Sequence, residues 1–148
     1  MRADQRTILL VEDNEDDEIM TLRSLKRSNL ANPVIVARDG QEALDYLFGQ
    51  GAYAGRDVKD LPQVVLLDLK LPKLSGLQVL EQIRNREETR LLPVVILTSS
   101  DEEQDMVESY RLGGNSYVRK PVAFSGLSDS VQQLGLYWLL INKTPGGR

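Results

Sequence analysis

A chain of 148 residues suffices for one ordinary domain, and its 41% hydrophobic and 27% charged residues are close to the average of soluble globular proteins. The absence of cysteine and histidine excludes disulfides, thiolate catalysis and imidazole acid–base chemistry, so any chemistry must use carboxylates, hydroxyls, lysine and arginine. A net charge of −4 without a basic stripe argues against a nucleic-acid partner, and no window reaches the roughly 20 apolar residues of a membrane span.

Four short apolar segments, rich in β-branched residues, and a weaker fifth are predicted to be strands. Their apolar residues are continuous rather than alternating, which is typical of parallel strands covered on both faces. The segments are 7–11, 34–37, 64–67, 94–97 and, shortest of all, 116–118. Pro33, Pro62 and Pro93 stand at the strand entries, where a proline interrupts no helix.

The stretches between these strands carry apolar residues at helical spacing, which predicts a βα unit repeated five times and an α/β fold. The first four stretches show this spacing at Ile19, Leu22 and Leu25, at Ala43, Leu44 and Leu47, at Leu77, Leu80 and Ile83, and at Met106, Val107 and Tyr110. Gly113 and Gly114 are expected to end the fourth helix. We expect residues 49–62 to form one long loop, residues 1–142 one domain, and residues 143–148 a disordered tail.

Polar residues follow the predicted strands at the points where each strand ends. These are Glu12 and Asp13 after the first, Asp68 after the third, Thr98 after the fourth, and Lys120 with Pro121 after the fifth. In an open parallel sheet the carboxyl ends of the strands share one edge, where ligands bind. The sequence therefore predicts that three carboxylates, a hydroxyl and an ammonium group meet there.

Three neighbouring carboxylates repel one another, and a hard divalent cation would relieve that repulsion. Mg²⁺ prefers oxygen ligands and binds through one or two carboxylates together with phosphoryl oxygens. We expect Asp13 and Asp68 to be direct ligands and Glu12 to act through a water molecule. Asp68 could then attack phosphorus while Lys120 and Thr98 meet the phosphoryl oxygens, forming an acyl phosphate.

This pattern resembles the CheY-like receiver domain of two-component response regulators, over nearly the whole chain. The matching motifs are Glu12-Asp13-Asn14, the segment 66–76 with Asp68, Pro72 and Gly76, Leu97-Thr98-Ser99, and Tyr117-Val118-Arg119-Lys120-Pro121. The resemblance implies a three-layer sandwich with five helices and a five-stranded parallel sheet in the order 2-1-3-4-5. It also implies that the carbonyl of Lys70 is a metal ligand, that Thr98 and Tyr117 are switch residues, and that the bond before Pro121 is cis. Glu12 replaces the aspartate often found at its position.

The resemblance implies a single-domain response regulator that takes a phosphoryl group on Asp68 from a sensor histidine kinase and catalyses no reaction except its own phosphorylation and autodephosphorylation. The phosphoryl group could then pass from this chain to a histidine phosphotransfer protein as a further partner. The long loop and apolar last helix are also similar to the single-domain regulators associated with bacterial and cyanobacterial phytochromes. The first residues lack the apolar core of a secretory signal, so a cytoplasmic location is expected.

The last predicted helix is apolar around its final turns. Leu136, Tyr137, Leu139 and Leu140 lie off the stripe made by Leu127, Val131, Leu134, Trp138 and Ile141. Either the chain covers these four residues with its own tail or loop, or they form a homodimer interface. The sequence leaves both interpretations open.

Other interpretations of the acidic residues are simpler. Asp13 taken alone is a typical helix N-cap, and residues 15–18 are acids that complement a helix dipole. A haloacid-dehalogenase-type phosphatase needs an acid two residues after its nucleophile, where this chain has Lys70. A flavodoxin-like flavin protein needs a hydroxyl- or glycine-rich loop after the first strand, where this chain is acidic. A degenerate receiver would lack functional residues that are all present here.

Overall fold

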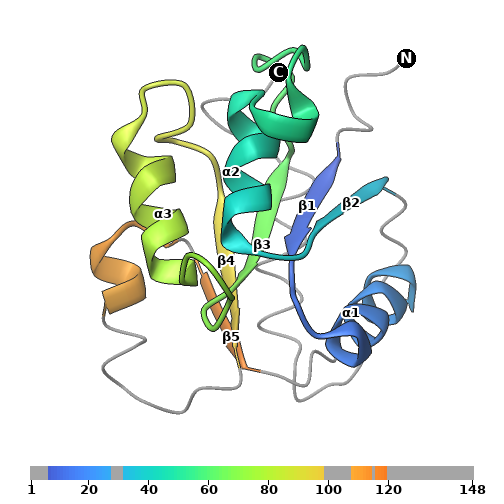
Figure 1. Ribbon diagram of the computed structural model, residues 1–148. Coiled ribbons are helices and arrows are strands. Elements are labelled where there is room, and N and C mark those ends of the chain that lie inside the picture. Colours follow the sequence, from blue (N-terminus) through green and yellow to red (C-terminus); the bar gives the residue numbers. More distant parts are fainter. Residues whose placement is uncertain (1–6, 28–31, 99–107, 115, 120–148) are drawn as a thin grey trace.

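The computed structural model of the chain describes residues 7–27, 32–98, 108–114 and 116–119. Within them the strands are β1 (Ile8–Val11), β2 (Val34–Ala37), β3 (Val64–Asp68), β4 (Val94–Thr98) and β5 (Ser116–Arg119). The helices are α1 (Glu15–Arg27), α2 (Gly40–Phe48), α3 (Gly76–Asn85) and the short 3-10 helix η2 (Gly51–Tyr53). Strands and helices alternate from β1 to β4, as predicted (Figure 1).

The five strands form one parallel sheet in the order β2-β1-β3-β4-β5, which confirms the predicted strand order. β1 pairs with both β2 and β3, and Val11 lies opposite Leu67. Because all the strands run in the same direction, their carboxyl ends lie at one edge of the sheet (Figure 1). We call this the carboxyl edge, and the opposite one the amino edge.

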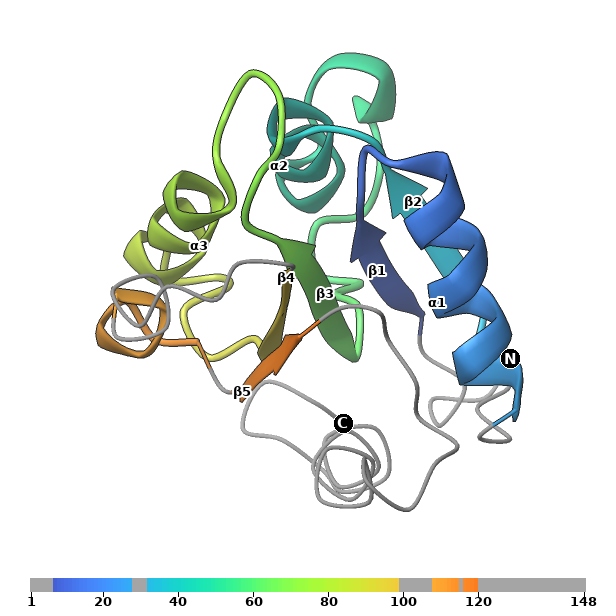
Figure 2. The ribbon, with the colours of Figure 1, turned by 90° about the horizontal axis from the view of Figure 1, so that it is seen from below.

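The core has two parts, one on each face of the sheet. Successive strand residues alternate between them: Leu9, Val11, Val65, Leu67, Val94 and Ile96 pack with α2 and α3, whereas Ile8, Leu10, Val64, Leu66, Val95 and Leu97 lie on the face that carries α1. Figure 2 shows α2 and α3 on one side of the strands and α1 on the other. Burial on both faces explains why the strand sequences are continuously apolar.

Side chains fix the points at which α2 and α3 begin. The carboxylate of Asp39 accepts a hydrogen bond from the backbone N–H of Glu42 at 2.7 Å, which caps α2. Ser75 and Gln78 form a reciprocal capping box at the start of α3. Both helices begin at the carboxyl edge, because each runs antiparallel to the strands.

The fourth predicted helix is described only over its last turn. Residues 108–111 are helical, Gly113 has a φ of 96°, and the N–H of Gly114 donates to the carbonyl of Ser109. The two glycines therefore end this helix as predicted. Tyr110 is 50% exposed and Ile19 of α1 is 42% exposed. Neither side chain therefore belongs to the core, although the helical spacing suggested that both would. Met106, Val107, the fifth helix and the tail lie outside the described residues.

The long loop after α2 is anchored at the amino edge by Arg56. Its guanidinium donates to the carbonyl of Tyr46 at 2.6 Å and to that of Asp60 at 2.9 Å, and it lies 4.1 Å from the centroid of the Tyr46 ring. Tyr53 of η2 meets the Tyr46 ring edge-on at 5.2 Å. The sequence showed the length of this loop but not these contacts.

Arg84, in the last turn of α3, forms a second anchor at the amino edge. Its guanidinium donates to the carbonyl of Gly113 at 2.6 and 2.9 Å and to that of Leu92 at 2.7 Å. Burial lowers the pKa of Arg84 from its ordinary value. One side chain thus joins α3 to the strand entry of β4 and to the end of the fourth helix.

Among the described helices, none is both long and apolar enough to cross a membrane.

Candidate functional site

The register of β1 with β3 brings two acids together. Val11 lies opposite Leu67, so the next residues along these strands, Glu12 and Asp68, are neighbours at the carboxyl edge. Asp68 is the last residue of β3 and is only 5% exposed, and Glu12 is fully buried. The Glu12 backbone continues the sheet by donating to the carbonyl of Ala37 at 2.9 Å. Strand pairing therefore fixes the backbone of both acids.

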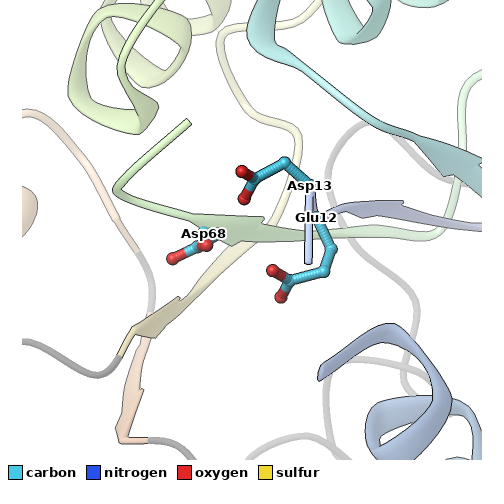
Figure 3. A group of neighbouring side chains, drawn as sticks. All are labelled: Glu12, Asp13 and Asp68. Atoms are coloured by element: carbon cyan, nitrogen blue, oxygen red, sulfur yellow. The ribbon is translucent and has the colours of Figure 1, made fainter. Parts of the chain in front are cut away.

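Asp13 completes a group of three carboxylates. One carboxylate oxygen from each of Glu12, Asp13 and Asp68 lies within 4.8 Å of the other two. Figure 3 shows the carboxyl groups of Glu12 and Asp13 turned toward the side on which Asp68 lies. Asp13 is exposed, unlike the other two acids, so the group opens to solvent on its side. The structure thus brings together the three acids that the sequence predicted to meet.

Asn14, and not Asp13, caps α1. The side-chain oxygen of Asn14 accepts a hydrogen bond from the N–H of Asp17 at 2.9 Å, and its carbonyl accepts one from Glu18 at 2.9 Å. The N–H of Asn14 itself donates to a carboxylate oxygen of Glu12 at 3.2 Å. Asn14 was not predicted as the cap, although an asparagine just before four acidic residues is a typical capping signal.

The turn after Asp68 packs tightly against the start of α3. The N–H of Gly76 donates to the carbonyl of Leu69 at 2.7 Å, and a Cβ atom at Gly76 would lie 2.2 Å from the carbonyl oxygen of Asp68. Only glycine fits at this position. The N–H of Lys70 lies 3.5 Å from a carboxylate oxygen of Asp68, so the Lys70 backbone is next to the acid, as the predicted ligand role requires.

Two ion pairs at the carboxyl edge were not predicted. Lys73, in the same turn, has a φ of 70°, and its ammonium group lies 3.5 Å from the carboxylate of Asp39. Arg38, just after β2, pairs with Glu18 of α1 at 2.5 Å. The hydrogen bond and charge of Glu18 raise the pKa of Arg38 above its ordinary value. These pairs connect the loops around the three acids, and they depend on loop geometry that spacing does not reveal.

The other predicted site residues are placed only in part. Thr98 is the last residue of β4, the strand next to β3, and Tyr117 lies opposite Ile96 in β5. The backbone of Thr98 therefore ends at the same edge as Asp68, while the side chains of Thr98 and Tyr117 are not described. Lys120, Pro121 and the interface residues Leu136, Tyr137, Leu139 and Leu140 lie outside the described residues.

The donor set of this site suits a hard divalent cation. Its side-chain donors are the carboxylate oxygens of Glu12, Asp13 and Asp68, and a cation would offset their mutual repulsion. Mg²⁺ and Mn²⁺ both favour such oxygen ligands. The three acids therefore fit a metal of this class, and Asp13 lies on the side open to solvent.

Comparison with known proteins places this geometry in a family. The family model for the response regulator receiver domain matches residues 8–132. Among curated proteins, the probable methanogenesis regulatory protein FilR2 of Methanothrix harundinacea is 42% identical over 140 residues, covering 94% of this chain and 87% of its own. Response regulator Rcp1 of Synechocystis is 37% identical over 134 residues, covering 90% and 89%.

Three solved structures are similar over almost the full length. The bacteriophytochrome response regulator AtBRR is 54% identical with a TM-score of 0.76, covering 93% of this chain and 98% of its own. The Mn²⁺-bound form of Rcp1 is 36% identical with a TM-score of 0.77, covering 95% and 99%. The phosphorylated cyanobacterial phytochrome response regulator RcpA is 36% identical with a TM-score of 0.79, also covering 95% and 99%.

Proposed function

The chain belongs to the response regulator receiver family, and from this membership we propose that Asp68 accepts a phosphoryl group from a sensor histidine kinase. The observation that carries the proposal is the meeting of Glu12, Asp13 and Asp68, whose carboxylate oxygens lie within 4.8 Å of one another at the carboxyl edge. Receivers signal by phosphorylation, and the similar regulator RcpA has been solved in its phosphorylated form.

The transfer uses the carboxylate of Asp68 as the nucleophile. One of its oxygens attacks phosphorus on a phosphohistidine, the nitrogen–phosphorus bond breaks, and its electron pair returns to the imidazole. The product on this chain is an acyl phosphate. Asp68 suits the role because its backbone is fixed by the sheet on one side and by the Gly76 turn on the other. A fixed nucleophile loses little entropy on reaching the reactive geometry.

We propose Mg²⁺ as the ion at this site, held by Asp13, Asp68 and the carbonyl of Lys70, with Glu12 acting through a water molecule. When bound, it would neutralise charge on the acids and on the incoming phosphoryl group. The Mn²⁺-bound form of Rcp1 supports a divalent ion of this kind. The role of the protein is to hold its carboxylates close together in advance, at the cost of their repulsion.

The response to phosphorylation is assigned by family resemblance to residues around the fourth and fifth strands. Lys120 would bind a phosphoryl oxygen, Thr98 would move to bond another, and Tyr117 would follow inward, with a cis bond before Pro121. Phosphorylation would then shift an equilibrium between two surface conformations. We propose that the chain catalyses only its own phosphorylation and autodephosphorylation.

For the kinase partner we propose a phytochrome. Its support is the similarity to AtBRR, Rcp1 and RcpA, two of which are described as phytochrome or bacteriophytochrome response regulators. We also propose a histidine phosphotransfer protein as a second partner. Purified bacteriophytochrome kinase, autophosphorylated with labelled ATP, should transfer label to this chain and not to Asp68→Asn. Equal transfer to both proteins would contradict the assignment of Asp68.

A homodimer through Leu136, Tyr137, Leu139 and Leu140 stays a prediction, since these residues lie outside the described part of the chain. Light scattering of the double variant Leu136→Glu with Leu140→Glu should report the monomer mass if these side chains form the interface. A dimer that persists in this variant would refute it.

The decisive experiment for the proposed function needs no partner. The protein is incubated with acetyl phosphate and Mg²⁺, and its intact mass is measured beside that of Asp68→Asn. We expect the wild type to gain the mass of one phosphoryl group, which hydroxylamine removes because an acyl phosphate is labile to it, and the variant to gain none. Chelation of Mg²⁺ should abolish the gain. No labelling of the wild type would refute the proposal.

A further inference from the structure

The buried carboxylate of Glu12 is oriented by the residue that caps α1. Glu12 is fully buried, and a buried carboxylate must be held by hydrogen bonds. The N–H of Asn14 provides one of these, at 3.2 Å from a Glu12 oxygen. This N–H can point toward Glu12 because Asn14 precedes the first residue of α1. The direction of the Asn14 N–H therefore depends on how α1 begins.

The side chain of Asn14 fixes that beginning. Its oxygen accepts the N–H of Asp17 at 2.9 Å, while its carbonyl accepts that of Glu18, also at 2.9 Å. Two hydrogen bonds thus lock the Asn14 backbone in the capping geometry. Asp13 lies between the locked residue and Glu12, whose backbone is held by the carbonyl of Ala37. The turn that carries both acids is therefore fixed at its two ends.

We infer that Asn14 is a positioning residue for the metal-binding acids: by capping α1 it holds its own N–H on Glu12 and fixes the turn that carries Asp13. The inference rests on the proposed function, because it assumes that these acids bind a divalent ion. It assigns Asn14 no contact with the metal or the phosphoryl group. Loss of the cap would let the Asn14 backbone turn away and would spread the positions of Glu12 and Asp13.

The variants Asn14→Ala and Asn14→Ser distinguish a role in positioning the acids from a role in overall stability. Alanine removes the capping oxygen, whereas serine retains one that reaches the same N–H. Outer-shell changes at metal sites typically weaken metal binding by about tenfold or more. We therefore expect Asn14→Ala to bind Mn²⁺ about tenfold more weakly than the wild type, and Asn14→Ser to recover most of that affinity.

A matched control comes from Thr89, which lies in the segment between α3 and β4. Thr89 is 1% exposed, and its hydroxyl donates to the carbonyl of Ile83 at 2.6 Å. Thr89→Val removes one structural hydrogen bond distant from the acids. It should lower the thermal unfolding midpoint as Asn14→Ala does, yet leave the Mn²⁺ affinity unchanged.

The measurement is titration of the full chain with Mn²⁺ alone, with free Mn²⁺ followed by electron paramagnetic resonance, beside thermal unfolding by circular dichroism. Wild-type affinity in Asn14→Ala would overturn the inference and leave the proposed function intact. So would an equal loss in Thr89→Val, or no recovery in Asn14→Ser. A wild type that binds no Mn²⁺ would instead overturn the proposed function, and the inference with it.

Discussion

At the amino edge of the sheet, arginines reach backbone carbonyls and aromatic rings, whereas at the carboxyl edge carboxylates face one another. Arg84 donates to the carbonyls of Gly113 and Leu92, and Arg86 lies 3.9 Å from the centroid of the Phe48 ring. At the other edge, oxygens of Glu12, Asp13 and Asp68 lie within 4.8 Å of one another. The first arrangement satisfies its charges within the fold, and the second gathers like charges.

The difference shows how one small fold separates stability from function. Guanidinium groups at the amino edge join elements that are far apart in the sequence, and their N–H donors are satisfied by carbonyls of the fold itself. We expect the carboxylates at the carboxyl edge to destabilise the fold in the absence of a cation through their mutual repulsion, and a bound cation to relieve that repulsion. Ion pairs such as Arg38 with Glu18 hold the loops of this edge without neutralising the three acids.

The largest effect is expected from Arg84→Met at the amino edge. The change keeps an unbranched side chain but removes the donors to the carbonyls of Gly113 and Leu92. Hydrogen bonds from a charged group contribute about 1.5–3 kcal/mol each, so we expect a loss of about 3 kcal/mol in the free energy of unfolding. Urea denaturation followed by circular dichroism measures it.

The control for Arg84 is Arg111→Met, which removes an exposed ion pair with Glu108. It should leave the urea midpoint nearly unchanged, because exposed pairs are screened by solvent. Both variants should bind Mn²⁺ like the wild type while folded. A weaker affinity in Arg84→Met would show that the two edges are coupled, and would break the comparison.

A smaller effect of opposite sign is expected at the carboxyl edge. Asp13→Asn removes one of three neighbouring charges, so it should raise the free energy of unfolding in EDTA by about 1 kcal/mol, the scale of a unit-charge interaction at such distances in water. With Mg²⁺ present the wild type should gain stability and the variant much less. Urea denaturation with and without Mg²⁺ provides the measurement.

Glu88→Gln is the matched control for Asp13, because it removes the same charge from an exposed position outside the cluster. It should change neither the stability in EDTA nor the stabilisation by Mg²⁺. If Asp13→Asn were destabilising in EDTA, the carboxylates would not be repelling one another, and the account of this edge would be wrong.

The strand-based part of both edges could be predicted from the sequence. Continuous apolar runs identified the strands, and the shared direction of parallel strands predicted that Glu12, Asp13 and Asp68 would meet. These predictions succeeded because they depend on local pattern and on one rule of sheet geometry. The switch roles of Thr98 and Tyr117 rest on resemblance, and the predicted interface rests on the apolar pattern of the last helix. The described residues test neither.

The contacts made by single long side chains could not be predicted. Arg84 stands in the last turn of a helix, where a cation usually complements the helix dipole in solvent, and nothing nearby in sequence indicates its contact with Gly113. Lys73 and Asp39 are likewise far apart in sequence, and their ion pair depends on a residue with positive φ. Asn14 was the exception, since its capping signal was present but masked by the acids around it.

The smallest effect is expected where one side chain connects the two edges. Tyr53, in the loop anchored at the amino edge, donates through its hydroxyl to a carboxylate oxygen of Glu42 at 3.2 Å, and the other Glu42 oxygen accepts the N–H of Arg38 at 2.9 Å. Burial, and then the charge of Glu42, raise the pKa of Tyr53 above its ordinary value. The folded protein therefore holds this proton more tightly than the unfolded chain does.

Stability contributed by Tyr53 should accordingly be present below the ordinary tyrosine pKa of about 10 and be lost as the pH rises through the higher folded-state value. At pH 8, Tyr53→Phe should lower the free energy of unfolding by about 0.5–1 kcal/mol, the net contribution of one hydrogen bond. Above pH 10 the difference between wild type and variant should shrink. Urea denaturation of both proteins from pH 8 to pH 11 measures this, and a difference that stays constant over that range would contradict the role of the hydroxyl proton. We expect the Mn²⁺ affinity of Tyr53→Phe to be unchanged. That result would show that the hydrogen bond between Tyr53 and Glu42 does not affect the positions of the three acids, and that the two edges act independently.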